Sequence, residues 1–188
     1  MLFLVGTFGL NFPIFISTMS VTVFHAGAGQ YGLLTSIMAA GSVTGALLAA
    51  RRTRPSILLL LVAAAIFGVT CAAAAVAPGY LAFGLILFTV GLAAQTFTTS
   101  TNSLTQMSTE PQMRGRVIAI LLAIALGGTP IGAPIAGWVA DHFGPRWALA
   151  VGAASGLLAA AIATLYLIER KRKLAARDVQ AKPAENAF

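Results

Sequence analysis

The sequence predicts an all-α membrane protein with six transmembrane helices, and three observations support this fold class. First, 58% of the 188 residues are hydrophobic, 9% are charged and the mean hydropathy is +0.88, which is unlike a soluble globular domain. Second, six apolar runs approach the roughly 20 residues that a helix needs to cross a bilayer. Third, the charged residues lie between these runs or after the last one, as the cost of burying charge in lipid requires.

The predicted spans follow from the apolar runs and the short polar connections between them. In chain order they cover residues 2–24, 31–50, 56–76, 80–101, 117–138 and 147–168. Together they form one transmembrane domain over residues 1–168. Residues 169–188 are polar and basic, so they predict a disordered cytoplasmic tail.

The basic residues predict the orientation of the spans. Of the 12 Lys and Arg residues, all but Arg146 fall on one side once the spans are threaded through a membrane. By the positive-inside rule this side is the cytoplasm, so both termini are cytoplasmic and the protein lies in the cytoplasmic (inner) membrane. The arginines expected to anchor this face are Arg51, Arg52, Arg54, Arg114 and Arg116. The high pI therefore indicates a lipid bilayer as partner, and no nucleic acid.

A short internal repeat links the second and fifth spans. The motif GxxxGAxxA occurs over residues 41–49 and again over residues 128–136. The two copies are three spans apart and so run in opposite directions, which is typical of a 3+3 inverted repeat in a secondary transporter. Because the motif is built of residues common in membrane helices, chance similarity is the alternative.

Polar residues are unevenly distributed among the spans. The third and sixth carry few and are predicted to face lipid. The first and fourth carry amides and hydroxyls at helical spacing, and the second has a weaker stripe of Thr35, Ser42 and Gly45. Such side chains either hold helices together or line a cavity. As candidate substrate-cavity residues we select Asn11, Thr18, Gln95, Thr98, Thr99 and Asn102.

Two spans contain helix-breaking residues. Pro13 predicts a kink in the first. The fifth combines prolines, which remove intrahelical hydrogen bonds, with glycines, which let a neighbouring backbone approach. We expect it to pivot at Gly128, Pro130, Gly132 and Pro134. The alternative is a tightly packed, kinked helix that does not move.

The chemistry of enzymes is missing from the sequence. The two histidines, His25 and His142, lie in connections and form no HExxH zinc motif, and the glycine-rich stretches lack the GxxxxGK[ST] pattern that cradles phosphates. The single Cys71 lies in an apolar run. We therefore expect no enzymatic activity, no metal and no cofactor.

Three stretches carry a resemblance to a known family. They are Gln-Tyr-Gly-Leu-Leu at 30–34, Glu-Pro-Gln-Met-Arg-Gly-Arg-Val at 110–117, and the segment from Gly132 to Arg146. The chain resembles the C-terminal six-helix half of a major facilitator superfamily transporter, closest to the branch of the enterobactin exporter and the macrolide efflux pumps. The resemblance implies half of a twelve-helix fold, alternating access and proton antiport.

Two departures from the family's pattern bear on this resemblance. The loop between the second and third spans lacks the family's Asp, whereas Asp141 and Arg146 in the outer turn resemble the family's loop motif. This pair is a candidate external gate or latch, or simply a turn-capping Asp beside a solvated Arg. The chain also provides only six spans, so it is either a fragment or a half that assembles with an N-terminal six-helix partner.

The sequence thus favours a secondary active transporter that exports an amphiphilic, drug-like or siderophore-like small molecule. No Asp or Glu lies in any span, so a proton-coupling carboxylate would belong to the other half. The alternative is a non-transporting membrane subunit that uses its GxxxG pairs as docking faces for other helices.

Overall fold

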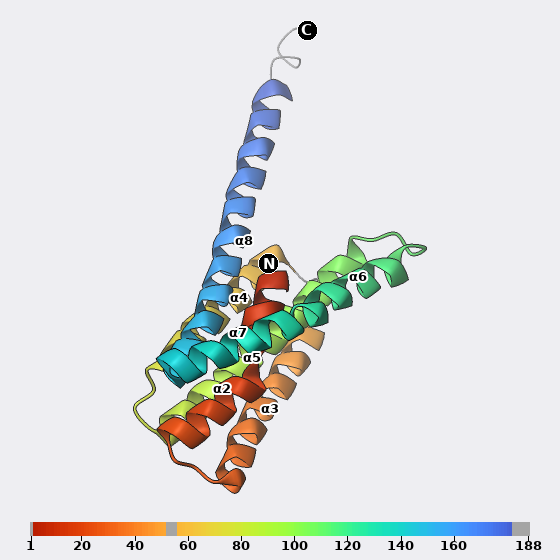
Figure 1. Ribbon diagram of the computed structural model, residues 1–188. Helices are drawn as coiled ribbons and strands as arrows, with labels where there is room; N and C mark the ends of the chain where they lie inside the picture. The colour runs from red at the N-terminus through yellow and green to blue at the C-terminus, as the bar shows by residue number, and fades with distance from the viewer. Residues whose placement is uncertain (1, 52–55, 182–188) are drawn as a thin grey trace, which may run out of the picture.

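The computed structural model describes residues 2–51 and 56–181, and it is all-helical within them (Figure 1). Within these residues six helical segments are long and apolar enough to cross a membrane, which confirms the predicted fold class. The predicted anchoring residues Arg52 and Arg54 lie outside the described residues.

The first span is interrupted in its middle. It consists of α1 (Leu2–Leu4), the π-helix η1 (Val5–Gly9), α2 (Phe12–Thr18) and the π-helix η2 (Met19–Val23). The ψ angles of Leu10 and Asn11 are 21° and 41°, so the backbone leaves helical geometry there. Pro13 causes this break, because it cannot donate to the carbonyl of Gly9 and its ring would crowd that residue. The predicted kink is thus confirmed, a few residues before the proline.

The next three spans are regular helices: α3 (Ala28–Ala50), α4 (Ile57–Ala75) and α5 (Tyr80–Met107). α3 starts before the predicted Tyr31 because the Gln30 side chain accepts a hydrogen bond from the Gly27 amide at 3.0 Å and caps the helix. α5 continues past the predicted Thr101 to Met107, because the added residues include neither Gly nor Pro and allow a helix to extend beyond the apolar run.

The fifth span consists of α6 (Arg114–Gly127) and α7 (Thr129–Phe143), and the sixth is α8 (Pro145–Ala181). Only Gly144 separates α7 from α8, with a φ of 97° that favours glycine. α8 continues as a helix to Ala181, where the sequence predicted a disordered tail. The residues from Glu169 to Ala181 are mostly strong helix formers, which explains the extension.

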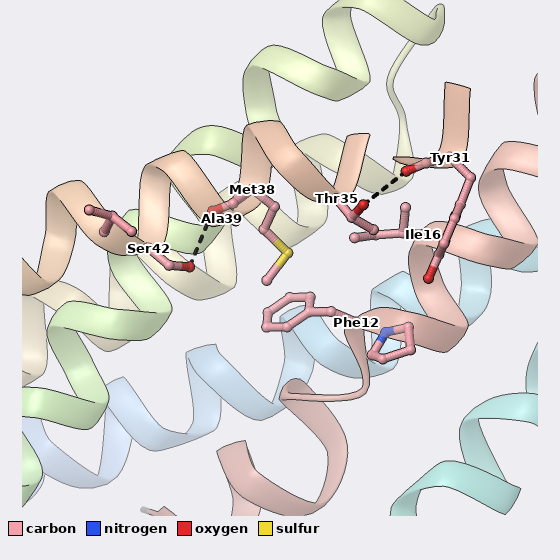
Figure 2. Close-up of a pocket in the computed structure, with 9 residues that line it drawn as sticks. Phe12, Ile16, Tyr31, Thr35, Met38, Ala39 and Ser42 are labelled. Atoms are coloured by element: carbon pink, nitrogen blue, oxygen red, sulfur yellow. Dashed lines mark hydrogen bonds between the residues drawn. The ribbon is translucent and has the colours of Figure 1, made fainter. Parts of the chain in front are cut away.

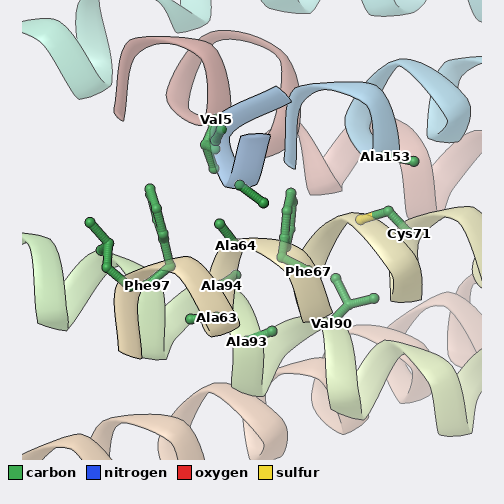
Figure 3. Packing of buried hydrophobic residues seen from close by; sticks show 13 residues of the cluster. Val5, Ala63, Ala64, Phe67, Cys71, Val90, Ala93, Ala94, Phe97 and Ala153 are labelled. Carbon is green, nitrogen blue, oxygen red and sulfur yellow. The ribbon is translucent and has the colours of Figure 1, made fainter. Parts of the chain in front are cut away.

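The helices pack in pairs around two hydrophobic clusters. α4 lies against α8 and α3 against α5, while α6 and α7 contact the broken first span. One cluster joins the first span, α4, α5 and α8 through residues such as Phe67, Cys71 and Phe97 (Figure 3). A second cluster, around Phe15 and Phe83, lies nearer the connection between the first span and α3.

Burial differs among the six spans. The most apolar 18-residue windows of the second and fifth spans are 17% and 11% buried, against 33% to 50% for the other four. α4 and α8 bury one side against each other and expose apolar side chains on the other, including Val69 and Leu165. The second and fifth spans thus expose more of their surface than the third and sixth, and the lipid-facing role of the third and sixth spans stays a prediction.

Candidate functional site

The two copies of the glycine motif lie at corresponding helix–helix contacts. Gly41 and Gly45 of α3 lie against the backbone of Phe88 and Leu92 in α5, and a Cβ on Gly45 would meet the Leu92 carbonyl oxygen at 2.5 Å. In the second copy, Gly128 and Gly132 lie against Thr7 of the first span. The second span thus packs on the fourth as the fifth packs on the first. A shift by three spans relates the two pairs, which supports the predicted 3+3 repeat.

Glycines also bring the third and sixth spans together. A Cβ on Gly68 of α4 would meet the backbone nitrogen of Leu157 at 2.7 Å, and one on Gly156 of α8 would meet the Phe67 ring at 2.7 Å. Gly152 is likewise buried, against the Phe15 ring. These glycines are already packed against helices of the same domain, so the structure gives no support to the alternative in which the GxxxG pairs dock a further membrane subunit.

Asn11 lies at the contact between the first and fifth spans. Its side chain is 3% exposed, and Nδ2 donates to the carbonyl oxygen of Thr7 at 2.7 Å. This bond replaces the backbone bond that a continuous helix would provide, since the backbone leaves helical geometry at Leu10. The Thr7 hydroxyl is buried beside Gly128 and has no hydrogen-bond partner among the described residues. The structure thus places Asn11 inside the helix packing, and not on the open surface that a cavity residue needs.

The four candidates of the fourth span lie together on α5. The Gln95 Nε2 donates to the Thr99 hydroxyl at 3.3 Å, and the Thr98 hydroxyl donates to the Ala94 carbonyl at 2.9 Å. Like Asn102, all of these side chains are half-buried. Thr18, on the first span, is also half-buried and donates to the carbonyl of Ile14 at 2.8 Å. The structure does not join it to the α5 group by any hydrogen bond between described residues.

The α5 stripe changes character along the helix. Near its start, Gly84 and Gly91 lie on the same side as Gln95 and contact α3, through Leu34 and Ser42 among others. These positions serve helix packing. From Gln95 to Asn102 the side chains on this side are half-buried amides and hydroxyls. That half of α5 is the part able to present polar groups to a ligand.

A groove between α2 and α3 was not predicted as a site. It has a volume of about 410 Å³, and Figure 2 shows the Phe12 ring and the Met38 thioether pointing toward one another across it. Its lining is Phe12, Pro13, Ile16, Tyr31, Thr35, Met38, Ala39, Ser42 and Val43. The weak stripe of Thr35 and Ser42 was the only sequence signal, because apolar side chains in a membrane helix indicate packing or lipid contact equally well.

The predicted pivot lies where α6 meets α7. Gly128 joins them with φ −75° and ψ −26°, which is helical geometry, Pro130 lies in the first turn of α7 and Pro134 lies inside it. Gly128 and Gly132 are buried against Thr7, whereas both prolines are exposed. The span therefore has weakened hydrogen bonding on one side and close glycine contacts on the other.

The charged candidates lie at the two ends of the bundle. Asp141 and Arg146 are exposed on either side of Gly144. The neighbouring His142 stacks its ring on that of Trp138, with the two ring centroids 4.6 Å apart. At the opposite end Arg51, Arg114 and Arg116 are exposed. The Arg114 Nε donates to the Thr109 carbonyl at 3.3 Å. The external latch and the inner anchors stay predictions.

Comparison with known proteins identifies the kind of chain that carries these features. A family model described as Major Facilitator Superfamily matches residues 1–186. No curated protein and no solved structure matches the chain. The match covers the six spans and most of the tail.

Proposed function

Because the chain belongs to the major facilitator superfamily and is a membrane transporter, we propose that it works as one six-helix half of a secondary active exporter. Its substrate is an amphiphilic small molecule, drug-like or siderophore-like, moved outward in exchange for protons. Within the superfamily we place it nearest the branch of the enterobactin exporter and the macrolide efflux pumps.

The observation that carries the substrate class is the uncharged polar surface of α5. Gln95, Thr98, Thr99 and Asn102 present amides and hydroxyls at half-buried positions, and none of these groups carries a charge. A small inorganic ion or a strongly anionic metabolite would need charged or densely polar ligands in the membrane. An amphiphilic molecule matches such a surface better, because it needs only a few hydrogen bonds within an otherwise apolar site.

The exposed second and fifth spans support assembly with an N-terminal six-helix half. α3 exposes Val43 and Leu47, and the fifth span exposes Ile124 and Ile131. The repeat relates these two spans to each other, so a partner half of similar architecture would contact both. The carboxylate that couples transport to protons would then belong to the partner, since the six apolar runs contain no Asp or Glu, and Asp141 and Glu169 lie beyond the ends of those runs.

Alternating access follows from the same arrangement. We assign the bending to the fifth span, at Gly128, Pro130, Gly132 and Pro134, where helix hydrogen bonding is weakened. Asp141 and Arg146 would close the outer end, and the arginines of the opposite end would hold the inner face in the cytoplasmic membrane with both termini in the cytoplasm. A reporter enzyme active only in the cytoplasm, fused after Phe188, should be active.

Transport by proteoliposomes tests the proposal. The protein, with any partner that copurifies, is reconstituted and the movement of a fluorescent amphiphilic dye is followed after a pH gradient is imposed. Gln95→Leu should lower the rate at least about ten-fold, because losing a hydrogen bond to substrate and leaving its partner unpaired costs roughly this factor. Thr70→Val in α4 is the control, since the Thr70 hydroxyl donates within its own helix, to the Ile66 carbonyl.

Two results would contradict the proposal in different ways. Equal transport by Gln95→Leu and the wild-type protein would remove the α5 surface from the substrate path. If the rate of dye movement is the same with and without the pH gradient, the protein is a transporter but proton exchange is not its energy source.

A further inference from the structure

The groove between α2 and α3 has the size and lining of a ligand site. Its volume of about 410 Å³ lies in the range of small-molecule pockets. It exists because the first and second spans make little direct contact, whereas each packs closely on another helix. Phe12 and Tyr31 contribute aromatic rings and Met38 an adaptable thioether. None of the nine lining side chains is charged.

The hydroxyl groups of Thr35 and Ser42 in the groove favour hydrogen-bond donors as partners. The Thr35 hydroxyl donates to the carbonyl of Gly32 at 2.8 Å, and the Ser42 hydroxyl donates to that of Met38 at 3.2 Å. With their protons engaged, both oxygens can only accept further hydrogen bonds. A molecule with an N–H or O–H group can therefore bond to either oxygen.

Tyr31 adds a group that calls for a polar partner. Figure 2 shows its side chain extending from α3 toward the first span, along the groove. Among the described residues nothing bonds to its hydroxyl, whereas the hydroxyl of Tyr80 donates to the Gln30 carbonyl at 2.8 Å. A lipid acyl chain in the groove would leave the Tyr31 hydroxyl and both acceptors unused. A ligand with polar as well as aromatic parts would use them.

We propose that this groove is a binding site for neutral, largely aromatic molecules that carry an N–H or O–H donor. The inference rests on the proposed export of an amphiphilic substrate and deepens it by naming the substrate class. The aromatic part packs between Phe12, Tyr31 and Met38, and the donor bonds to Thr35 or Ser42. The absence of charge in the lining disfavours anions and ions in general.

Two neighbouring alanines of α3 provide a matched pair of variants. Ala39 lines the groove, whereas Ala40 does not, and both are exposed. Ala39→Trp therefore fills the groove, while Ala40→Trp adds the same side chain to a different side of the same helix. Because neither position is packed, both variants should fold, which size-exclusion profiles and far-UV circular dichroism verify.

Binding is measured with N-phenyl-1-naphthylamine, a neutral aromatic amine whose fluorescence rises in apolar surroundings. The wild-type chain in lipid nanodiscs, corrected with protein-free nanodiscs, should bind it saturably. Ala39→Trp should lose at least about ten-fold in affinity, and Ala40→Trp should match the wild type. Equal binding by the two variants, or no saturable binding by the wild type, would overturn the site.

The donor requirement has its own readout. The hydrocarbon 1-phenylnaphthalene lacks the N–H group, so it should compete about five-fold more weakly, the value of one ordinary hydrogen bond. In the double variant Thr35→Val/Ser42→Ala this preference should disappear while hydrocarbon binding persists. A preference that survives in the double variant would refute the assigned acceptors.

Other occupants of the groove give distinguishable results. If native mass spectrometry finds a phospholipid on the wild type that only Ala39→Trp loses, the groove holds lipid and the proposal fails. If Ala39→Trp instead separates the chain from a copurifying partner, the groove holds protein and the proposal fails as well. Binding as expected without dye transport would refute the proposed exporter and leave the site standing. Dye transport by the wild type with equal binding by Ala39→Trp and Ala40→Trp would refute the site and leave the exporter standing.

Discussion

Adding a methyl group at Gly132 tests the contact between the fifth and first spans. A Cβ there would collide with the carbonyl oxygen of Thr7 and lie 3.1 Å from the Asn11 Nδ2. Neither group can move freely, because Asn11 donates to that carbonyl and both residues are buried. Gly132→Ala therefore forces α7 away from the first span.

The size of the effect follows from three contributions. Overpacking a close contact costs about 1–3 kcal/mol, and disturbing the hydrogen bond from Asn11 costs about 1 kcal/mol more. Alanine offsets about 1 kcal/mol through its higher helix propensity. The expected loss in the free energy of unfolding is thus about 1–3 kcal/mol, or a fall in melting temperature of roughly 2–12 °C for a domain of this size.

Thermal unfolding of the purified protein in detergent measures this change, with Gly137→Ala as control. Gly137 lies on the same helix, and a Cβ there has no neighbouring atom within 4 Å. The control should melt at or slightly above the wild-type temperature. If Gly132→Ala melted together with Gly137→Ala, the close approach of α7 to the first span would not exist as described.

Three further variants probe the first span and the outer turn by the same unfolding measurement. Asn11→Leu should destabilise the domain by about 1–3 kcal/mol because the Thr7 carbonyl loses its donor; wild-type stability combined with lost transport would instead make Asn11 a substrate ligand. Thr7→Val should raise the melting temperature by a few degrees, since it replaces a buried hydroxyl without a partner by a methyl group of similar size, and a lower melting temperature would reveal a partner for the hydroxyl. Gly144→Ala should cost about 1–2 kcal/mol because its φ of 97° disfavours a side chain; an unchanged melting temperature would show that the turn adopts another conformation.

The number and order of the spans could be predicted because lipid imposes a simple requirement on the sequence. Each span needs a long uncharged apolar run, and such runs are unmistakable in this chain. Helix ends were less predictable. Hydropathy detects the bilayer and not the helix, so polar extensions such as those ending at Met107 and Ala181 appeared as loop and tail although their residues favour a helix.

The candidate site could be predicted only where it lies on one regular helix. The α5 stripe follows from spacing alone, because 3.6 residues per turn place Gln95, Thr99 and Asn102 on one side. Asn11 shows the same periodicity on the first span but lies near a break, so its amide bonds to the backbone. The groove depends on how far α2 and α3 diverge, and no local pattern encodes that separation.

The same glycine motif therefore forms helix–helix contacts with two different kinds of partner in this domain. Its first copy meets α5, a continuous helix whose backbone hydrogen bonds run through the contact at Phe88 and Leu92. Its second copy meets the first span where Pro13 has interrupted the helix and where an asparagine side chain replaces a backbone donor. Glycine spacing determines where two helices can approach, and the two copies differ in whether the partner helix is continuous there. A symmetric repeat can thus give an asymmetric domain, with one contact between intact helices and one beside a break.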